Sequence, residues 1–156
     1  FVIIGKGFSG GEYPASKIIT TAPMDNLNQF GALVTNGQEE LASLSYLITM
    51  KFVEENGKMV QEMGSLYESC LRKLVEEFPA LLEKIEWIGH LAGIHFRDAG
   101  KGLEFAKKLN QGGIDASAHG YKPKSLPAVL TKLPLISSEI VVEAIIARMH
   151  SVLETL

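Results

Sequence analysis

The amino-acid sequence predicts a fold of the α/β class, with an α+β arrangement in its C-terminal part. Short runs of apolar and β-branched residues, typical of strands, occur near both ends of the 156-residue chain. Two long amphipathic stretches separate these runs, and the pattern then continues in the order strand, helix, strands, helix. This order, without internal repeats or low-complexity tracts, is typical of helices packed on a sheet.

The start of the chain predicts two strands joined by a glycine-rich loop. Residues 1–4 (FVII) predict a short buried strand, because all four are apolar. Residues 5–11 (GKGFSGG) predict the loop. Residues 13–21 suit a second strand, because β-branched residues gather toward their end. Pro23 and the polar run DNLNQ then break the strand pattern.

Two helices are expected in the middle of the chain. Thr35 and Gln38 have the spacing of a capping box, which marks a helix start. Apolar residues then recur on one helical face at Leu41, Leu44, Ile48 and Phe52. Gly57 is expected to bend or interrupt this helix. A second amphipathic stretch ends before Pro79, and its apolar face comprises Val60, Met63, Tyr67, Cys70 or Leu71, Leu74 and Phe78.

The last third of the chain predicts shorter elements. Residues 87–96 (WIGHLAGIHF) predict a strand whose two glycines permit close backbone approach. Residues 103–109 predict a helix stopped by Gly112–Gly113, and residues 114–117 and 128–131 predict short strands. A final helix is expected after Ser137 or Ser138, with an inward face of Val141, Ile145, Met149, Val152 and Leu156.

A shift in composition near residues 35–52 predicts a domain boundary. Residues 1–36 are expected to form the edge of one domain, residues 37–56 a connecting helix, and residues 57–156 a compact second domain of α/β type. The chain begins with Phe in what reads as a core strand, and we therefore expect it to be a piece of a longer polypeptide.

Charge and composition argue against several classes of function. The formal net charge of −3 gives no electrostatic reason to expect nucleic acid, and no apolar run reaches the roughly 20 residues of a membrane span. The single cysteine, Cys70, excludes an internal disulfide and fits a cytoplasmic location. No metal site is predicted, because the histidines lack metal-ligand spacing; they are His90, His95, His119 and His150.

The glycine-rich loop raises several interpretations. Gly5, Gly7 and Gly10 match the G-x-G-x-x-G spacing of a dinucleotide-binding turn. That turn requires a helix after the third glycine, yet residues 11–21 show no apolar stripe of helical period. A Walker-type phosphate loop does not fit, because its lysine follows the glycines. Lys6 is then either a solvated surface lysine, the commoner case, or an amine nucleophile that forms a Schiff base with a carbonyl.

The segment GKGFSGGEYPAS resembles the lysine segment of class III pyridoxal-phosphate-dependent aminotransferases, the group of the ornithine, acetylornithine and 4-aminobutyrate enzymes. In that pattern a lysine follows an apolar strand and precedes two glycines and then a Tyr-Pro pair. Here the lysine is Lys6, the glycines are residues 10–11, and the Tyr-Pro pair is residues 13–14. The resemblance implies that Lys6 holds pyridoxal 5′-phosphate as a Schiff base. It also implies a fold-type-I transferase, of which this chain is the C-terminal portion: the end of the large domain plus the small domain.

The resemblance continues more loosely after the loop. The TNG sequence at residues 35–37 is similar to a family segment whose Ser or Thr reaches the cofactor phosphate of the neighbouring subunit, which makes Thr35 a candidate cofactor ligand. A plain helix cap explains Thr35 equally well. Many members carry an arginine that binds a substrate carboxylate before a Pro-Pro-Leu element, similar to LPL at residues 133–135. Leu130 occupies that place, and the nearby Lys132 offers only a point charge for substrate binding.

The resemblance implies an enzyme that transfers an amino group between an amino acid or amine and a 2-oxo acid, and that is a homodimer in its full-length form. Other parts of the family's cofactor site lie upstream of the lysine, so the chain alone is expected to be inactive. Within the family, an aminomutase or racemase with the same lysine chemistry stays open as an alternative. Two alternatives outside it stay open: a non-catalytic dimerisation or interaction module, and the start of a dinucleotide-binding domain.

Overall fold

The computed structural model describes residues 1–13, 16–26, 28, 31, 40–119 and 128–156. The chain divides into two compact units, Phe1–Gly57 and Lys58–Leu156. Each unit has its own sheet, and the long helix α1 contributes to both. The mixed α/β class predicted from the sequence is confirmed, because helices and strands alternate along the chain.

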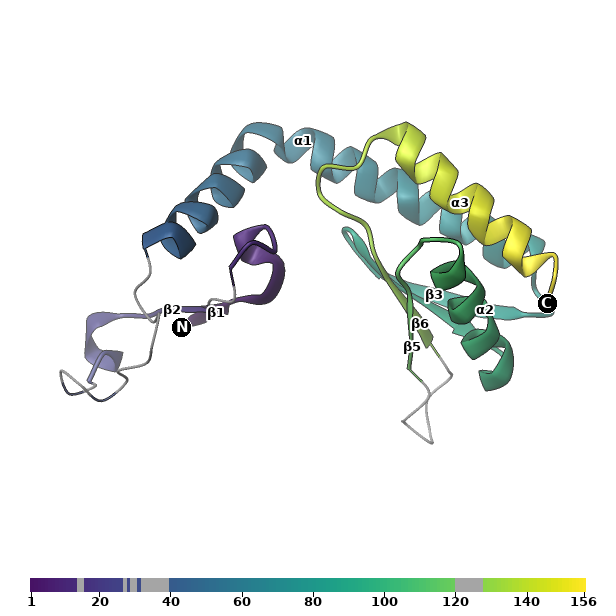
Figure 1. The fold of residues 1–156 in the computed structure, drawn as a ribbon, viewed down its shortest axis with the longest axis horizontal. Coiled ribbons are helices and arrows are strands. Elements are labelled where there is room, and N and C mark those ends of the chain that lie inside the picture. The colour runs from purple at the N-terminus through teal and green to yellow at the C-terminus, as the bar shows by residue number, and fades with distance from the viewer. Residues whose placement is uncertain (14–15, 27, 29–30, 32–39, 120–127) are drawn as a thin grey trace. The chain divides into compact units, whose positions relative to one another are not determined.

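The first unit contains a two-stranded antiparallel sheet, seen at the N-terminal end in Figure 1. Strand β1 (Val2–Ile4) pairs with β2 (Lys17–Ile19). Two short 3-10 helices follow these strands, η1 (Lys6–Ser9) and η2 (Ala22–Met24). The prediction of a buried first strand is wrong, because a pair of strands alone provides no second layer to cover it. Its apolar side chains are more than half exposed at Phe1, Val2 and Ile3.

Helix α1 (Glu40–Glu77) joins the two predicted helices into one run. The backbone leaves the helical region at Asn56, where φ is −116° and ψ is 15°. The interruption predicted at Gly57 is therefore confirmed, one residue earlier. The side-chain amide of Asn56 donates a hydrogen bond to the carbonyl oxygen of Phe52 at 2.9 Å, and such side-chain competition for backbone groups disfavours a regular helix interior.

The apolar face predicted for the first half of α1 is wrong in its orientation. Ala42 and Tyr46 are each only 4% exposed. Three residues of the predicted apolar face are more than half exposed: Leu41, Leu44 and Ile48. The reason is that the loop of the same unit packs on a different strip of the helix, where the ring of Phe8 contacts that of Tyr46 at a centroid distance of 5.2 Å.

The second unit is built on a four-stranded antiparallel sheet with the strand order β3-β4-β6-β5. The strands are β3 (Leu82–Ile88), β4 (Leu91–Phe96), β5 (Ser117–His119) and β6 (Ala128–Lys132). The single strand predicted at residues 87–96 is wrong: this segment contains the hairpin turn between β3 and β4. Gly89 in that turn has a φ of +58°, a conformation that glycine adopts without a steric cost.

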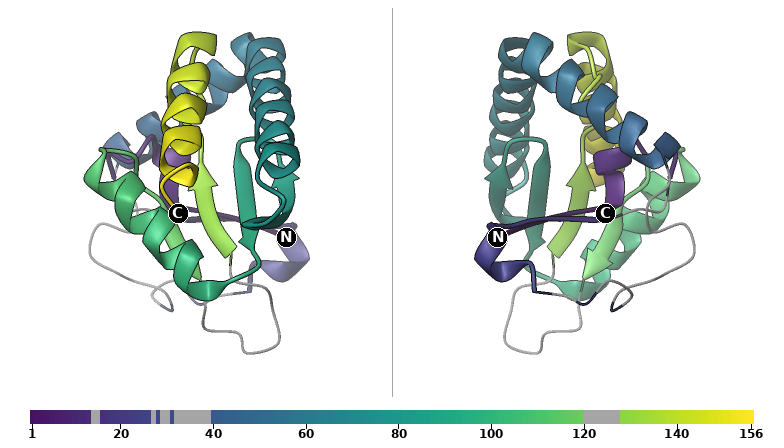
Figure 2. Two further views of the ribbon diagram at one scale, coloured as in Figure 1. Left: turned by 90° about the vertical axis from the view of Figure 1, so that its right-hand side faces the viewer. Right: turned by 90° about the vertical axis from the view of Figure 1, so that its left-hand side faces the viewer.

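Three helices cover one face of this sheet: the second half of α1, α2 (Ala99–Gln111) and α3 (Glu139–Leu153), as Figures 1 and 2 show. The core lies between them and the sheet. Its largest fully buried members are Tyr67, Phe96, Phe105, Leu71, Leu82, Leu109, Met149, Val129 and Val142. The apolar face predicted for the second half of α1 is thus confirmed.

Local signals set the ends of α2 and α3. Asp98 caps α2 by accepting a hydrogen bond from the backbone amide of Lys101 at 2.9 Å. Gly113, with a φ of +84°, follows its C-terminus, as the glycine pair predicts. Ser138 is the N-cap residue of α3, but Val141 is 42% exposed, so its predicted inward position is wrong. Val142 is buried in its place.

The turn between β3 and β4 lies against α1. Gly64 of α1 has no side chain, and a Cβ atom there would stand 3.1 Å from the carbonyl oxygen of Gly89. The two ring nitrogens of His90 lie 2.7 Å from the carbonyl oxygen of Val60 and 3.1 Å from that of Leu133. His90 therefore joins the turn both to the helix and to the segment after β6.

Candidate functional site

Lys6 begins the η1 turn directly after β1 and Gly5. Its φ is +56°, and it is the only residue other than glycine with a positive φ in the described part of the chain. The side chain is exposed, and it forms no hydrogen bond or ion pair with the described residues. An L-residue adopts this left-handed conformation only at an energetic cost. Such backbone strain is concentrated at functional sites, where the surrounding structure maintains it.

The loop that carries Lys6 is held by its own backbone. The Phe8 amide donates to the Gly5 carbonyl at 3.1 Å, and the Gly10 amide donates to the Gly7 carbonyl at 3.0 Å. Gly10 and Gly11 have φ angles of +69° and +87°, which require glycine for an unstrained turn. The glycines noted in the sequence therefore shape a tight turn that leaves the lysine at the surface.

The position of Lys6 permits amine chemistry. The Lys6 amine is exposed and has no hydrogen-bond or ion-pair partner among the described residues, so a carbonyl compound can reach it. The unprotonated form of a primary amine is a nucleophile. The ring contact between Phe8 and Tyr46 fixes the loop to α1, so the backbone that carries this amine is anchored at a second point. The arrangement suits covalent attachment of a carbonyl-bearing cofactor.

The structure disfavours the dinucleotide interpretation of the same loop. Gly10 is the C-cap of η1 and begins no helix: residues 11–13 form a turn, and β2 starts at Lys17. A dinucleotide-binding turn holds its pyrophosphate at the N-terminus of the helix after the third glycine. Among the residues that the structure describes between Gly10 and Met24, the only helix is the short η2.

The other two predicted site residues are located differently. Thr35 lies outside the described residues, so its role stays a prediction. Lys132 is the last residue of β6, exposed, and opposite Leu91 in the sheet register. Lys6 belongs to the first unit and Lys132 to the second.

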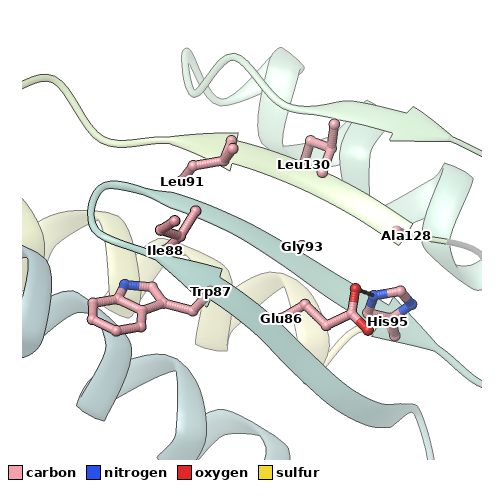
Figure 3. Close-up of a pocket in the computed structure, with 8 residues that line it drawn as sticks. All are labelled: Glu86, Trp87, Ile88, Leu91, Gly93, His95, Ala128 and Leu130. Atoms are coloured by element: carbon pink, nitrogen blue, oxygen red, sulfur yellow. Dashed lines mark ion pairs between the residues drawn. The ribbon is translucent and has the colours of Figure 1, made fainter.

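The face of the second sheet opposite its three helices contains a pocket of about 310 Å³ (Figure 3). It is lined mainly by apolar residues, together with one ion pair: Glu86, Trp87, Ile88, Leu91, Gly93, His95, Ala128 and Leu130. Leu130, the residue in the place of the family's arginine, thus lies in an apolar setting.

Sequence reasoning missed the ion pair in this pocket. His95 Nε2 and Glu86 Oε2 are 3.2 Å apart, on neighbouring strands. A hydrogen bond and the charge of Lys84, followed by the charge of His95, lower the pKa of Glu86. The pair could have been predicted from the sequence if the turn of the β3–β4 hairpin had been placed correctly. Side chains alternate between the two faces along a strand, and with that turn Glu86 and His95 lie on the same face of the sheet.

Two further classes of site are absent from the described part of the chain. No group of three or more His, Cys, Asp or Glu residues there is arranged to hold a metal ion. None of its helices has the length and apolar character needed to cross a bilayer. Cys70 is partly buried on α1, where it lines a second pocket, formed by residues of α1 and α3.

Comparison by sequence gives no relative. No protein-family model matches the chain, and no curated protein matches it.

Comparison with solved structures gives many matches. The chain superposes on acetylornithine aminotransferase from Elizabethkingia anophelis with a TM-score of 0.81 and 22% identity, covering 99% of this chain and 40% of that one. A transaminase from the marine bacterium Virgibacillus gives a TM-score of 0.83 at 13% identity, covering 98% and 38%. Ornithine aminotransferase from Toxoplasma gondii gives 0.79 at 18% identity, covering 98% and 36%.

These matches concern the fold, because every identity lies below 25%. The chain spans between about a third and two fifths of the length of the aminotransferases it matches. Almost all of its own residues take part in the superposition. The chain therefore has a mixed α/β fold that matches part of the fold-type-I aminotransferase structures.

Proposed function

We propose that this chain is the C-terminal portion of a class III aminotransferase that depends on pyridoxal 5′-phosphate, and that Lys6 carries the cofactor. The observation that carries the proposal is the conformation of Lys6: an exposed amine on a left-handed backbone, in an anchored glycine loop. The lysine motif and the fold likeness to aminotransferases support it. The end of the large domain then comprises residues 1–36, and the small domain residues 57–156.

The described residues are compatible with this cofactor. Lys6 Nζ has no competing partner among them, and Gly7 beside it has open space where a side chain would begin. Thr35 is proposed as a ligand of the phosphate of the neighbouring subunit's cofactor, in a homodimer. The structure of the Toxoplasma gondii enzyme has partial occupancy of this cofactor at its active site. When bound, pyridoxal phosphate acts as the electron sink for amino-group transfer.

The chain's own contribution centres on Lys6. Its Nζ holds the cofactor covalently in the resting enzyme, and when released it accepts and returns a proton at the reacting carbon of the substrate. The anchored loop keeps this nitrogen in place during both roles, which is the positioning that such catalysis requires. The proposed substrates are an amino acid or amine as donor and a 2-oxo acid as acceptor. Lys132 is proposed as a weak contact for a substrate carboxylate.

The test is amino-group transfer by the full-length protein with pyridoxal phosphate. Lys6→Ala is expected to lower kcat by about 100-fold or more, the usual contribution of a positioned acid–base group. Lys51→Ala is the matched control, because Lys51 is an exposed lysine of the same unit that pairs only with Glu54 and Glu55 among the described residues. The 156-residue chain alone is expected to show no turnover. Wild-type activity in Lys6→Ala would refute the proposal.

A further inference from the structure

Ser9 is the one polar residue among the described residues of the first unit that is fully buried. Its exposed fraction is 1%, although it lies at the other end of the same short turn as the exposed Lys6. Burial of a hydroxyl is unfavourable unless hydrogen bonds replace its contacts with water. The position of Ser9 therefore requires an explanation from its partners.

Both hydrogen-bonding functions of the Ser9 hydroxyl go to one residue. Its Oγ donates to the carbonyl oxygen of Tyr13 at 2.7 Å and accepts from the amide of Tyr13 at 3.4 Å. The amide of Glu12 also donates to the carbonyl of Ser9, at 3.4 Å. Together these bonds close the turn through Gly10 and Gly11 and fix the C-terminal end of η1.

The turn is also fixed against α1. Phe8, the residue before Ser9, packs its ring on Tyr46. Gly10, the residue after it, lies close enough to the helix that a Cβ atom there would stand 3.8 Å from Thr49 Oγ1. Ser9 thus lies between two residues that approach α1, while Lys6 lies at the N-terminal end of the same turn.

We propose that Ser9 is a positioning residue for Lys6. The left-handed backbone at Lys6 is unfavourable for a lysine by itself, so it persists because the rest of the turn is fixed. Because η1 contains only four residues, loss of the Ser9 hydrogen bonds frees the turn and lets Lys6 relax toward the ordinary right-handed region. The direction of the Lys6 amine then changes, although Ser9 itself touches no substrate or cofactor. This inference rests on the proposed function of Lys6.

The experiment measures how fast pyridoxal phosphate attaches to Lys6 in the full-length protein. The apoprotein is mixed with the cofactor, and the absorbance of the lysine-bound form is followed with time, alongside the thermal midpoint of each variant. Ser9→Ala is expected to slow attachment at least about fivefold, the factor that corresponds to one net hydrogen bond of about 1 kcal/mol. Ser9→Thr keeps the hydroxyl and is expected to stay within about twofold of wild type, because both hydrogen bonds to Tyr13 are retained.

Ser45→Ala is the matched control. Ser45 lies on α1 in the same unit, and its Oγ donates to the carbonyl of Ala42 at 2.8 Å, so the variant also loses one serine hydrogen bond. It should attach the cofactor at the wild-type rate. The proposal is overturned if Ser9→Ala attaches at the wild-type rate, or if both alanine variants are slowed equally. Failure of the wild-type protein to attach the cofactor at Lys6 would instead refute the proposed function.

Discussion

At the scale of single residues, Tyr67 is a buried group in the described part of the chain whose titration folding changes strongly. Its side chain is 1% exposed, and its Oη lies 2.6 Å from Thr131 Oγ1. Burial raises the pKa of Tyr67 to about 12, and the hydrogen bond with Thr131 opposes that shift in part. The neutral phenol is therefore the form that the folded core accommodates.

This pKa predicts how stability depends on alkaline pH. The unfolded tyrosine loses its proton near pH 10, whereas the folded one retains it to about pH 12. The contribution of Tyr67 to the free energy of unfolding is thus complete below pH 10, and it falls by about 1.4 kcal/mol per pH unit between pH 10 and about pH 12. Tyr67→Phe should be about 1 kcal/mol less stable at pH 8, and this difference should shrink as the pH approaches 11. Urea unfolding measures both, and a difference that does not change with pH would contradict the assignment.

Some residue roles could be predicted from the sequence, and others could not. Lys6 stands out because its neighbours form a motif, and the motif is local in the chain. Ser9 and Tyr67 do not stand out, because their roles depend on burial and on partners that only the folded chain brings near. The ion pair of Glu86 and His95 joins two strands whose register could not be known before the hairpin turn was placed.

At the scale of elements, the close packing of α1 on the β3–β4 turn depends on Gly64. A Cβ atom at this position would stand 3.1 Å from the carbonyl oxygen of Gly89 and 3.2 Å from His90 Cδ2. Gly64→Ala is therefore expected to destabilise the protein by about 1–3 kcal/mol, as overpacking of a close contact does. The measurement is the free energy of unfolding in urea.

Gly57 provides the contrasting variant on the same helix. It has open space at the Cβ position and does not have a positive φ. Gly57→Ala should stabilise the protein by up to about 1 kcal/mol, because alanine favours the helix and restricts the unfolded chain. Equal effects of the two substitutions would show that the close approach at Gly64 is not what limits stability.

Helices and strands could be predicted well where apolar residues recur at a regular spacing over several turns. The face of the second half of α1 was correct because Tyr67, Leu71 and Leu74 recur over several turns. The β3–β4 hairpin was missed because Gly89 and His90 interrupt an otherwise apolar run, and a two-residue turn leaves little signal. Residues 114–117 were predicted as a strand, whereas β5 begins only at Ser117.

At the scale of the whole molecule, the two units differ in how they bury apolar side chains. The second has a continuous core between helices and sheet. In the first, the buried hydrophobic residues among those described are Ala42 and Tyr46, while many large ones are exposed: Phe1, Val2, Ile3, Ile18, Ile19, Met24, Leu41, Leu44, Leu47, Ile48, Met50 and Val53. Sequence patterns identify such residues as apolar but do not indicate what covers them.

The most direct test of the central claim is to locate the cofactor on the chain. The full-length protein is incubated with pyridoxal phosphate and reduced with borohydride, which converts a lysine-bound cofactor into a stable adduct, and its peptides are then mapped by mass spectrometry. Because Lys6 is the proposed site of attachment, the account predicts one major adduct, on the peptide that contains Lys6. An unmodified Lys6 in a folded protein, or an adduct mainly on another lysine, would contradict it.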